Sequence, residues 1–167
     1  MSIREQLRAL NFHDTNLLSF RVSFGSGKER HATVDLEYYD WEGNSLRRAT
    51  DPHAAWRTKR LTIAFGFLAT LEFSGPDLVN RAQSIDTAEV DYRLDWFKER
   101  RDAFKLEFPR GTYPIFDDGS EVVSLRFSTQ NNDDDSCGYF WIAGSQVQLS
   151  EGTETSVGQT HFALSQF

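Results

Sequence analysis

Alternating apolar and polar residues run along most of this chain and predict a fold made mainly of β-strands. In residues 32–39, Val34, Leu36 and Tyr38 alternate with polar neighbours, as expected of a strand with one buried face. Residues 17–24 alternate in the same way, and the loop between the two segments opens with Gly-Ser-Gly. The two segments therefore predict a hairpin.

The same alternation recurs further along the chain and predicts more strands. Gly66 is expected to mark a bulge or a close approach of another segment, and Gly144 to disturb the last strand. Residues 41–44 are expected to begin a polar connection, and the charged residues 98–102 to form the turn of a hairpin. The further strands are expected at residues 59–67, 68–73, 88–97, 104–108, 121–129 and 139–149.

The first residues predict a short helix. Ser2 and Glu5 have the spacing of a capping box, in which each side chain satisfies a backbone N–H group at the start of the helix. Apolar residues then recur at helical spacing on one face, so we expect the helix to span residues 3–10 and to pack on the sheet. Asn11 is expected to close it in a left-handed conformation.

Together these patterns predict a mainly β protein: an antiparallel β-sandwich or a strongly curved sheet built from hairpins, with one short N-terminal helix. A length of 167 residues fits one domain, and no linker or repeat divides the chain. We therefore expect a single domain over residues 1–167. Residues 150–167 are expected to form a loosely ordered tail, because apolar residues become scarce there.

Composition favours a cytoplasmic location. The 14 Phe, 5 Tyr and 4 Trp suit sheet surfaces, and no segment approaches the roughly 18 apolar residues of a membrane span. The N-terminus lacks the apolar run of a secretory signal. Cys137 is the single cysteine and cannot form an internal disulfide, which favours a reducing compartment. We expect a soluble cytoplasmic protein that does not engage membranes.

The net charge of −7 is concentrated near the C-terminus. Residues 1–110 balance acids and bases, whereas residues 111–167 hold Arg126 as their single base among many acids. Such a surplus repels phosphates, so we expect no nucleic-acid partner, and it would steer a basic protein towards this region. Ordinary solvation of loops is the alternative explanation. The acids expected to meet a partner are Asp117, Asp118, Asp133, Asp134 and Asp135.

His13 and Asp14 are the most suggestive pair for catalysis. A carboxylate that orients a histidine is part of many general-base systems. Adjacent residues seldom aim their side chains at each other, however, and an Asp at a helix-to-strand turn can cap backbone N–H groups instead. The pair is therefore interpreted mainly as a turn.

Other candidate chemistry is incomplete. Asn131, Asp133 and Asp135 alternate like the first ligands of a calcium loop, but Ser136 stands where that loop needs glycine and Ile142 where it needs glutamate. Acidic neighbours disfavour the thiolate of the cysteine, and no Gly-x-Ser-x-Gly elbow or phosphate-binding glycine loop is present. We expect no catalytic residues, no bound metal and no cofactor.

Trp41 and Trp56 flank a polar connection rather than occupying the middle of a strand. Beside Arg47, Arg48 and Arg57, an exposed tryptophan pair would suit a hot spot for a protein partner or a stacking platform for a sugar or base. Anchoring in the core is the alternative.

Several short motifs resemble a set of small bacterial proteins. They are Asn11-Phe12-His13-Asp14-x-x-Leu17-Leu18, a paired strand that ends at Asp40, Trp56-Arg57, and Arg60-Leu61-Thr62-Ile63-Ala64-Phe65. Over residues 10–75 the chain is similar to the YxiG-like group and to immunity proteins of polymorphic toxin systems. The resemblance implies a β-rich, non-catalytic domain, and the immunity-type members bind and neutralise a cognate toxin.

The sequence therefore predicts a non-catalytic, cytoplasmic protein-binding module, immunity-like, that engages a basic partner through its acidic C-terminal region. The alternative is a small-ligand-binding protein or an enzyme whose site forms inside the curved sheet near His13 and Asp14.

Overall fold

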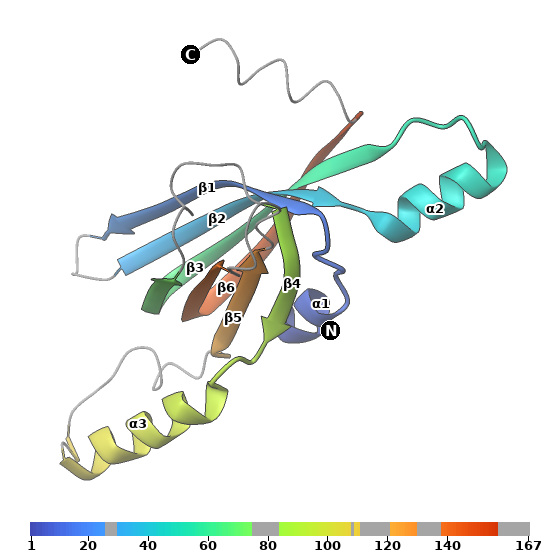
Figure 1. The fold of residues 1–167 in the computed structure, drawn as a ribbon. Helices are drawn as coiled ribbons and strands as arrows, with labels where there is room; N and C mark the ends of the chain where they lie inside the picture. The colour runs from blue at the N-terminus through green and yellow to red at the C-terminus, as the bar shows by residue number, and fades with distance from the viewer. Residues whose placement is uncertain (26–29, 75–83, 108, 111–120, 130–137, 157–167) are drawn as a thin grey trace.

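The computed structural model describes residues 1–25, 30–74, 84–107, 109–110, 121–129 and 138–156. Within these ranges the fold is mainly β, which confirms the prediction from the alternating pattern (Figure 1). In chain order the elements are α1 (Ile3–Arg8), β1 (Thr15–Phe24), β2 (Arg30–Tyr39), α2 (Trp41–Thr50), β3 (Arg57–Ser74), β4 (Ser84–Val90), α3 (Leu94–Glu107), β5 (Val123–Thr129) and β6 (Gly138–Ser156).

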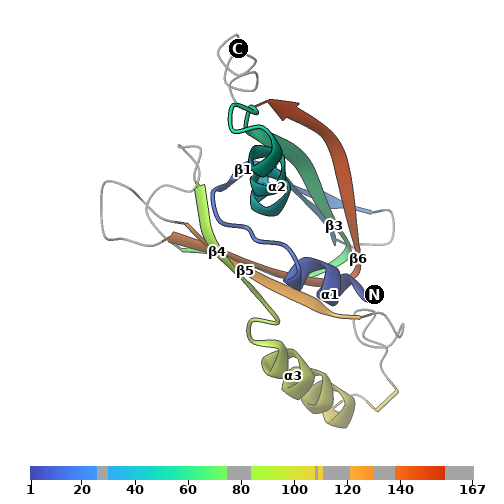
Figure 2. The same ribbon diagram turned by 90° about the vertical axis from the view of Figure 1, so that its right-hand side faces the viewer.

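The strands form one antiparallel sheet in the order β1-β2-β3-β6-β5-β4, and the sheet closes where β4 returns to β1 (Figure 2). Among the described residues this closure rests on two register pairs, Thr15 with Ile85 and Asn16 with Ser84. Of the two forms that the sequence left open, the strongly curved sheet is the one observed. The expected hairpins β1–β2 and β5–β6 are both present.

β3 and β6 are the longest strands and pair with each other along almost their full length. The two strands expected within residues 59–73 are one bent strand, with a register shift opposite Gly144. A side chain at Gly144 would place its Cβ 2.0 Å from the carbonyl oxygen of Phe67, so the crossing needs glycine. The expected close approach at Gly66 also exists, because the side chain of Gln146 lies against it.

Apolar side chains from every strand fill the interior of the curved sheet. α1 covers one end, where Leu7 is fully buried. The ring of Phe12 meets the rings of Phe127 and Tyr38 edge-on, with centroid separations of 5.4 and 6.1 Å. Such edge-to-face pairs add to the hydrophobic gain of burial. The interior is therefore a packed apolar core.

The N-terminal helix begins as expected and ends sooner. Ser2 and Glu5 form the capping box, with each side chain bonded to the other residue's backbone N–H. The helix ends at Arg8, and the C-cap residue Ala9 keeps a right-handed conformation. Asn11 is not left-handed either, so that prediction was wrong. The left-handed residue in this turn is Asp14, with φ 61°. Aspartate tolerates that conformation because its short polar side chain can bond locally.

The connection after β2 contains a helix, α2, where the sequence predicted a polar connection. Asp40 caps it by accepting a hydrogen bond from the backbone N–H of Gly43 at 2.9 Å. α2 carries no apolar stripe, and Asn44 is its single buried residue. The pattern of apolar residues did not indicate this helix, because its one buried residue, Asn44, is polar.

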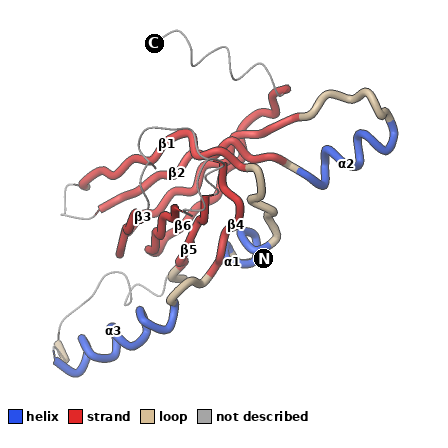
Figure 3. The backbone as a smooth tube through the Cα atoms, viewed as in Figure 1, coloured by secondary structure: helices blue, strands red, loops and turns tan. Residues whose placement is uncertain are grey.

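The second difference concerns residues 88–108. β4 ends at Val90, and Asp91 and Arg93 adopt left-handed conformations that break the expected strand. α3 then replaces the predicted hairpin. It projects from the sheet at the end opposite α2 (Figure 3). Phe97 anchors its first turn by packing on Trp141 of β6, at a centroid separation of 5.9 Å.

The expected tail is only partly described. Residues 151–156 continue β6 and pair with β3. Residues 157–167 lie outside the described residues.

Candidate functional site

Aromatic side chains from four parts of the chain gather at the base of α2. We call His13, Tyr39, Trp41, Arg48 and Trp56 the aromatic cluster. The ring of Tyr39 lies 4.7 Å from that of Trp41 and 5.5 Å from that of Trp56, and the two tryptophans are 6.0 Å apart. The three rings are all half-buried. The structure thus brings together the two tryptophans that the sequence singled out.

Local structure explains why these rings meet. Tyr39 ends β2 and Trp41 begins α2, with the capping residue Asp40 turning the chain between them. The indole N–H of Trp41 donates to the carbonyl oxygen of His13 at 3.1 Å. The His13 ring stacks on Trp41, with centroids 6.1 Å apart and planes inclined by 24°. The turn before β1 is therefore tied to the start of α2.

Arg48 completes the cluster from the last turns of α2. Its guanidinium lies 4.6 Å from the centroid of the Trp56 ring, a cation–π contact. It also donates to the carbonyl oxygen of Ala54 at 3.2 Å, which fixes the loop that leads to Trp56. Burial raises the pKa of the Tyr39 phenol, and the nearby carboxylate of Asp14 raises it further.

Asn44 holds α2 to the start of β3. Its side-chain amide donates to the carbonyl oxygen of Arg57 at 2.8 Å and accepts from the Arg57 N–H at 2.9 Å. This side chain therefore bonds both backbone groups of one residue, as a neighbouring strand would. Because Asn44 is buried, these bonds position the helix and its aromatic cluster on the sheet.

The described acids of the C-terminal region have partners within the chain. Glu154 lies 3.4 Å from Arg47 and 3.2 Å from Arg57, and Glu151 lies 2.9 Å from Lys59. The fold therefore brings acids of β6 against bases of α2 and β3. These acids and bases are far apart in the sequence, but in the fold their charges largely balance each other.

All of the acids that were predicted to bind a partner lie outside the described residues. These are Asp117, Asp118, Asp133, Asp134 and Asp135. The incomplete calcium pattern that begins at Asn131 and the single cysteine, Cys137, also lie outside them.

His13 and Asp14 lie on the surface beside the aromatic cluster. Their side chains are 49% and 50% exposed, and the imidazole Nε2 is 3.7 Å from the Asp14 carboxylate. The other ring nitrogen, Nδ1, lies 3.3 Å from the carboxylate of Asp86 on β4. In the described ranges, no three His, Cys, Asp or Glu side chains are placed to share a metal ion.

One buried carboxylate, that of Asp35, was not predicted from the sequence. Asp35, on the outer face of β2, has a side chain that is only 2% exposed and that accepts hydrogen bonds from Ser19, Arg21, Arg60 and Thr62. Burial alone would raise the pKa of Asp35, but the bonds from Arg60, Thr62 and Ser19 outweigh it and lower the pKa to about 2.

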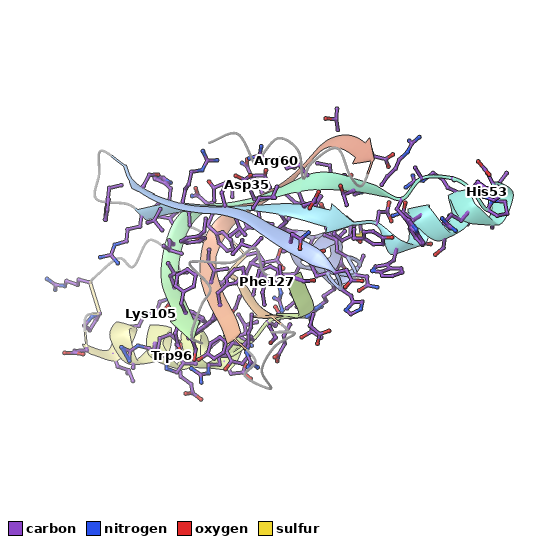
Figure 4. The ribbon with its side chains drawn as sticks, turned by 45° about the horizontal axis from the view of Figure 1, so that its top comes forward. Asp35, His53, Arg60, Trp96, Lys105 and Phe127 are labelled. Atoms are coloured by element: carbon purple, nitrogen blue, oxygen red, sulfur yellow. The ribbon has the colours of Figure 1, made fainter. Side chains whose placement is uncertain are left out.

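The Asp35 network lies on the surface of the sheet away from α2 and α3 (Figure 4). Nothing in the alternation separates Asp35 from its polar neighbours on β2, because its donors come from β1 and β3. The network ties β1, β2 and β3 together, and it does not touch the aromatic cluster.

Comparisons with known proteins add no family. No family model, curated protein or solved structure matches the chain. No helix in the described part of the chain is long and apolar enough to cross a membrane.

Proposed function

We propose that this chain is a non-catalytic, cytoplasmic protein-binding module, immunity-like, and that the aromatic cluster is the centre of its binding surface. The observation that carries the proposal is the half-buried group of Tyr39, Trp41 and Trp56 with Arg48 over one ring. Tryptophan, tyrosine and arginine are the residues in which the binding energy of protein interfaces concentrates.

The position of the cluster supports this role. It is built on ordered elements, because Asn44 fixes α2 to β3 and the side chain of Trp41 is bonded to the turn before β1. Rings that are already held in place lose little conformational freedom when a partner covers them. The cluster therefore has both the residue types and the rigidity that a hot spot needs.

The acidic residues predicted to meet a partner have a second role in this proposal. Asp117, Asp118, Asp133, Asp134 and Asp135 would attract a basic partner from a distance, while the aromatic cluster would supply short-range affinity. Changing Asp133, Asp134 and Asp135 to Lys should then slow association and flatten its dependence on salt.

The alternative function is a small-ligand-binding protein or an enzyme with its site near His13 and Asp14. One observation favours it: the imidazole of His13 lies between the carboxylates of Asp14 and Asp86. A thermal-shift screen of small molecules tests it. The alternative requires a stabilising ligand whose effect disappears in a His13→Ala variant, and the protein-binding proposal requires none.

The main proposal is tested by affinity capture from a lysate of the native host, with quantitative mass spectrometry. The wild-type chain is compared with a Trp41→Ala/Trp56→Ala variant and with a control, Trp96→Ala, that removes a partly exposed ring from α3. A partner should be enriched by the wild type and the control and lost with the double variant.

Circular dichroism should first establish that the double variant keeps its β structure. If it does and still captures the same partner, the cluster is not the binding surface and the proposal fails. Equal loss with Trp96→Ala would also count against it, because that ring belongs to the other end of the molecule.

A further inference from the structure

The rim of the aromatic cluster is acidic on one side. Asp14 and Asp86 have side chains that are 50% and 42% exposed, and both border the His13 ring. Neither carboxylate forms an ion pair with a lysine or arginine of the described residues, and His13 is the side chain that contacts both. The His13 ring that both carboxylates contact stacks on Trp41, so the two carboxylates border the aromatic cluster, and the Asp14 carboxylate contributes to the raised pKa of the Tyr39 phenol.

This arrangement differs from the surroundings of four other described acids. Asp35, Asp91, Glu151 and Glu154 are each met by a lysine or arginine of the chain. Beside the aromatic cluster, two carboxylates instead contact the ring of His13, which stacks on the partly exposed ring of Trp41. Ring faces and carboxylates both attract cations, so this side of the cluster is complementary to a positive group.

The cluster itself shows which cation fits. Arg48 lies over the Trp56 ring at 4.6 Å, so one part of the cluster already accommodates a guanidinium. A guanidinium is planar, stacks on aromatic faces and can bond carboxylates through two N–H groups, whereas an ammonium acts as a compact and strongly hydrated charge. A second guanidinium would find the rings of Tyr39 and Trp41 beside the His13 ring that both carboxylates contact.

We propose that the protein partner places an arginine side chain against Tyr39 and Trp41, beside the His13 ring and the two carboxylates, Asp14 and Asp86, that flank it. This inference rests on the proposed function and specifies its partner: a protein that presents arginine at the centre of its binding surface. It also assigns the attraction for a basic partner to described residues at the cluster, besides the acidic segments that the sequence indicated.

The test uses a probe of defined chemistry, the peptide acetyl-Gly-Arg-Gly-amide, titrated into the full-length protein labelled with nitrogen-15. The indole N–H signals of Trp41 and Trp56 should move in a saturable way at millimolar peptide, while those of Trp96 and Trp141 should stay. The matched peptide acetyl-Gly-Lys-Gly-amide should bind more weakly, because an ammonium neither stacks nor forms two parallel bonds.

Variants then separate this site from general acidity. Asp14→Asn/Asp86→Asn should weaken binding of the arginine peptide by about fivefold or more, since it removes both rim charges. Asp95→Asn/Glu107→Gln removes the same total charge from α3, at the far end of the molecule, and should leave the affinity unchanged.

Three results would overturn the inference: equal weakening by the two double variants, tighter binding of the lysine peptide, or signal changes confined to other parts of the protein. The proposed function has its own outcome. If a captured protein partner depends on Trp41 and Trp56 but not on Asp14 and Asp86, the binding surface stands and the arginine assignment falls.

Discussion

The buried carboxylate of Asp35 allows a quantitative prediction about stability. The pKa of this group falls from its usual 3.8 to about 2 in the folded chain, which corresponds to about 2 kcal/mol of stability. Because the folded pKa is the lower one, this contribution is complete well above pH 3.8. It is lost as the pH falls towards 2.

The test compares the wild type with Asp35→Asn in urea unfolding at pH 3 to 6, at constant ionic strength. At pH 6 the variant should be less stable by about 3–5 kcal/mol, because it loses the charge and turns amide hydrogens towards hydrogen-bond donors. At pH 3 the difference should be smaller by about 1 kcal/mol, since the wild-type carboxylate is then losing part of its advantage.

Asp95→Asn is the control for this experiment, because the Asp95 side chain on α3 is 88% exposed and pairs with a neighbour on its own helix. It should change the stability by about 0.5 kcal/mol or less. A difference between wild type and Asp35→Asn that stays constant from pH 3 to 6 would refute the reasoning, since the carboxylate would then not be held charged by its donors.

Three further changes test the local structure by urea or thermal unfolding. Asn44→Ala leaves the backbone N–H and carbonyl of Arg57 without their side-chain partner and should lower the free energy of unfolding by about 2–4 kcal/mol. The control Ser45→Ala changes an exposed residue of the same helix and should lower it by about 0.5 kcal/mol or less. Gly144→Ala would place a Cβ against the backbone of Phe67 and should lower the free energy of unfolding by about 3 kcal/mol or more. In the control Gly152→Ala the Cβ would lie 3.2 Å from the side chain of Arg60, and the loss should be much smaller. Ser2→Ala removes the helix cap and should cost about 1 kcal/mol. These assignments would be contradicted if Asn44→Ala and Ser45→Ala had equal effects, or if Gly144→Ala and Gly152→Ala did. No effect of Ser2→Ala would contradict the assignment of the cap.

The sequence predicted the β1–β2 hairpin and the start of α1 correctly because strand alternation and helix capping are local signals. Val34, Leu36 and Tyr38 are buried as their spacing indicates, and Ser2 caps α1 through a bond three residues away. Neither feature depends on which distant segment lies next to it, so both can be read from a short window.

The sequence misassigned residues 88–108 because their alternation of apolar and charged residues is typical of a strand, whereas contacts with distant residues make Leu94–Glu107 a helix. The choice is made by Phe97, which packs on Trp141, and by left-handed turns at Asp91 and Arg93. These contacts come from β6 and could not be anticipated locally. α2 offered one usable signal, the capping residue Asp40.

The candidate site was predictable in part. Trp41, Trp56 and Arg48 could be grouped because they flank the same connection. Tyr39 is two residues from Trp41 in the chain, whereas His13 joins the cluster only through the pairing of β1 with β2. The acidic rim also depends on the closure of the sheet, because Asp86 contacts His13 where β4 pairs with β1.

The pairing of β3 with β6 also has a consequence for the order in which the protein can be made. Ser74 pairs with Tyr139 and Arg57 with Ser156, so all of residues 75–137 must leave the ribosome before this pairing can begin. Until then β1, β2 and β3 can associate, but β3 presents an unpaired edge and buried-type side chains such as Ile63 and Phe65 to solvent. A nascent chain arrested in that interval should aggregate or recruit a chaperone rather than form a smaller stable domain. The acidic, partly polar last third is thus the segment that completes the folding unit during synthesis.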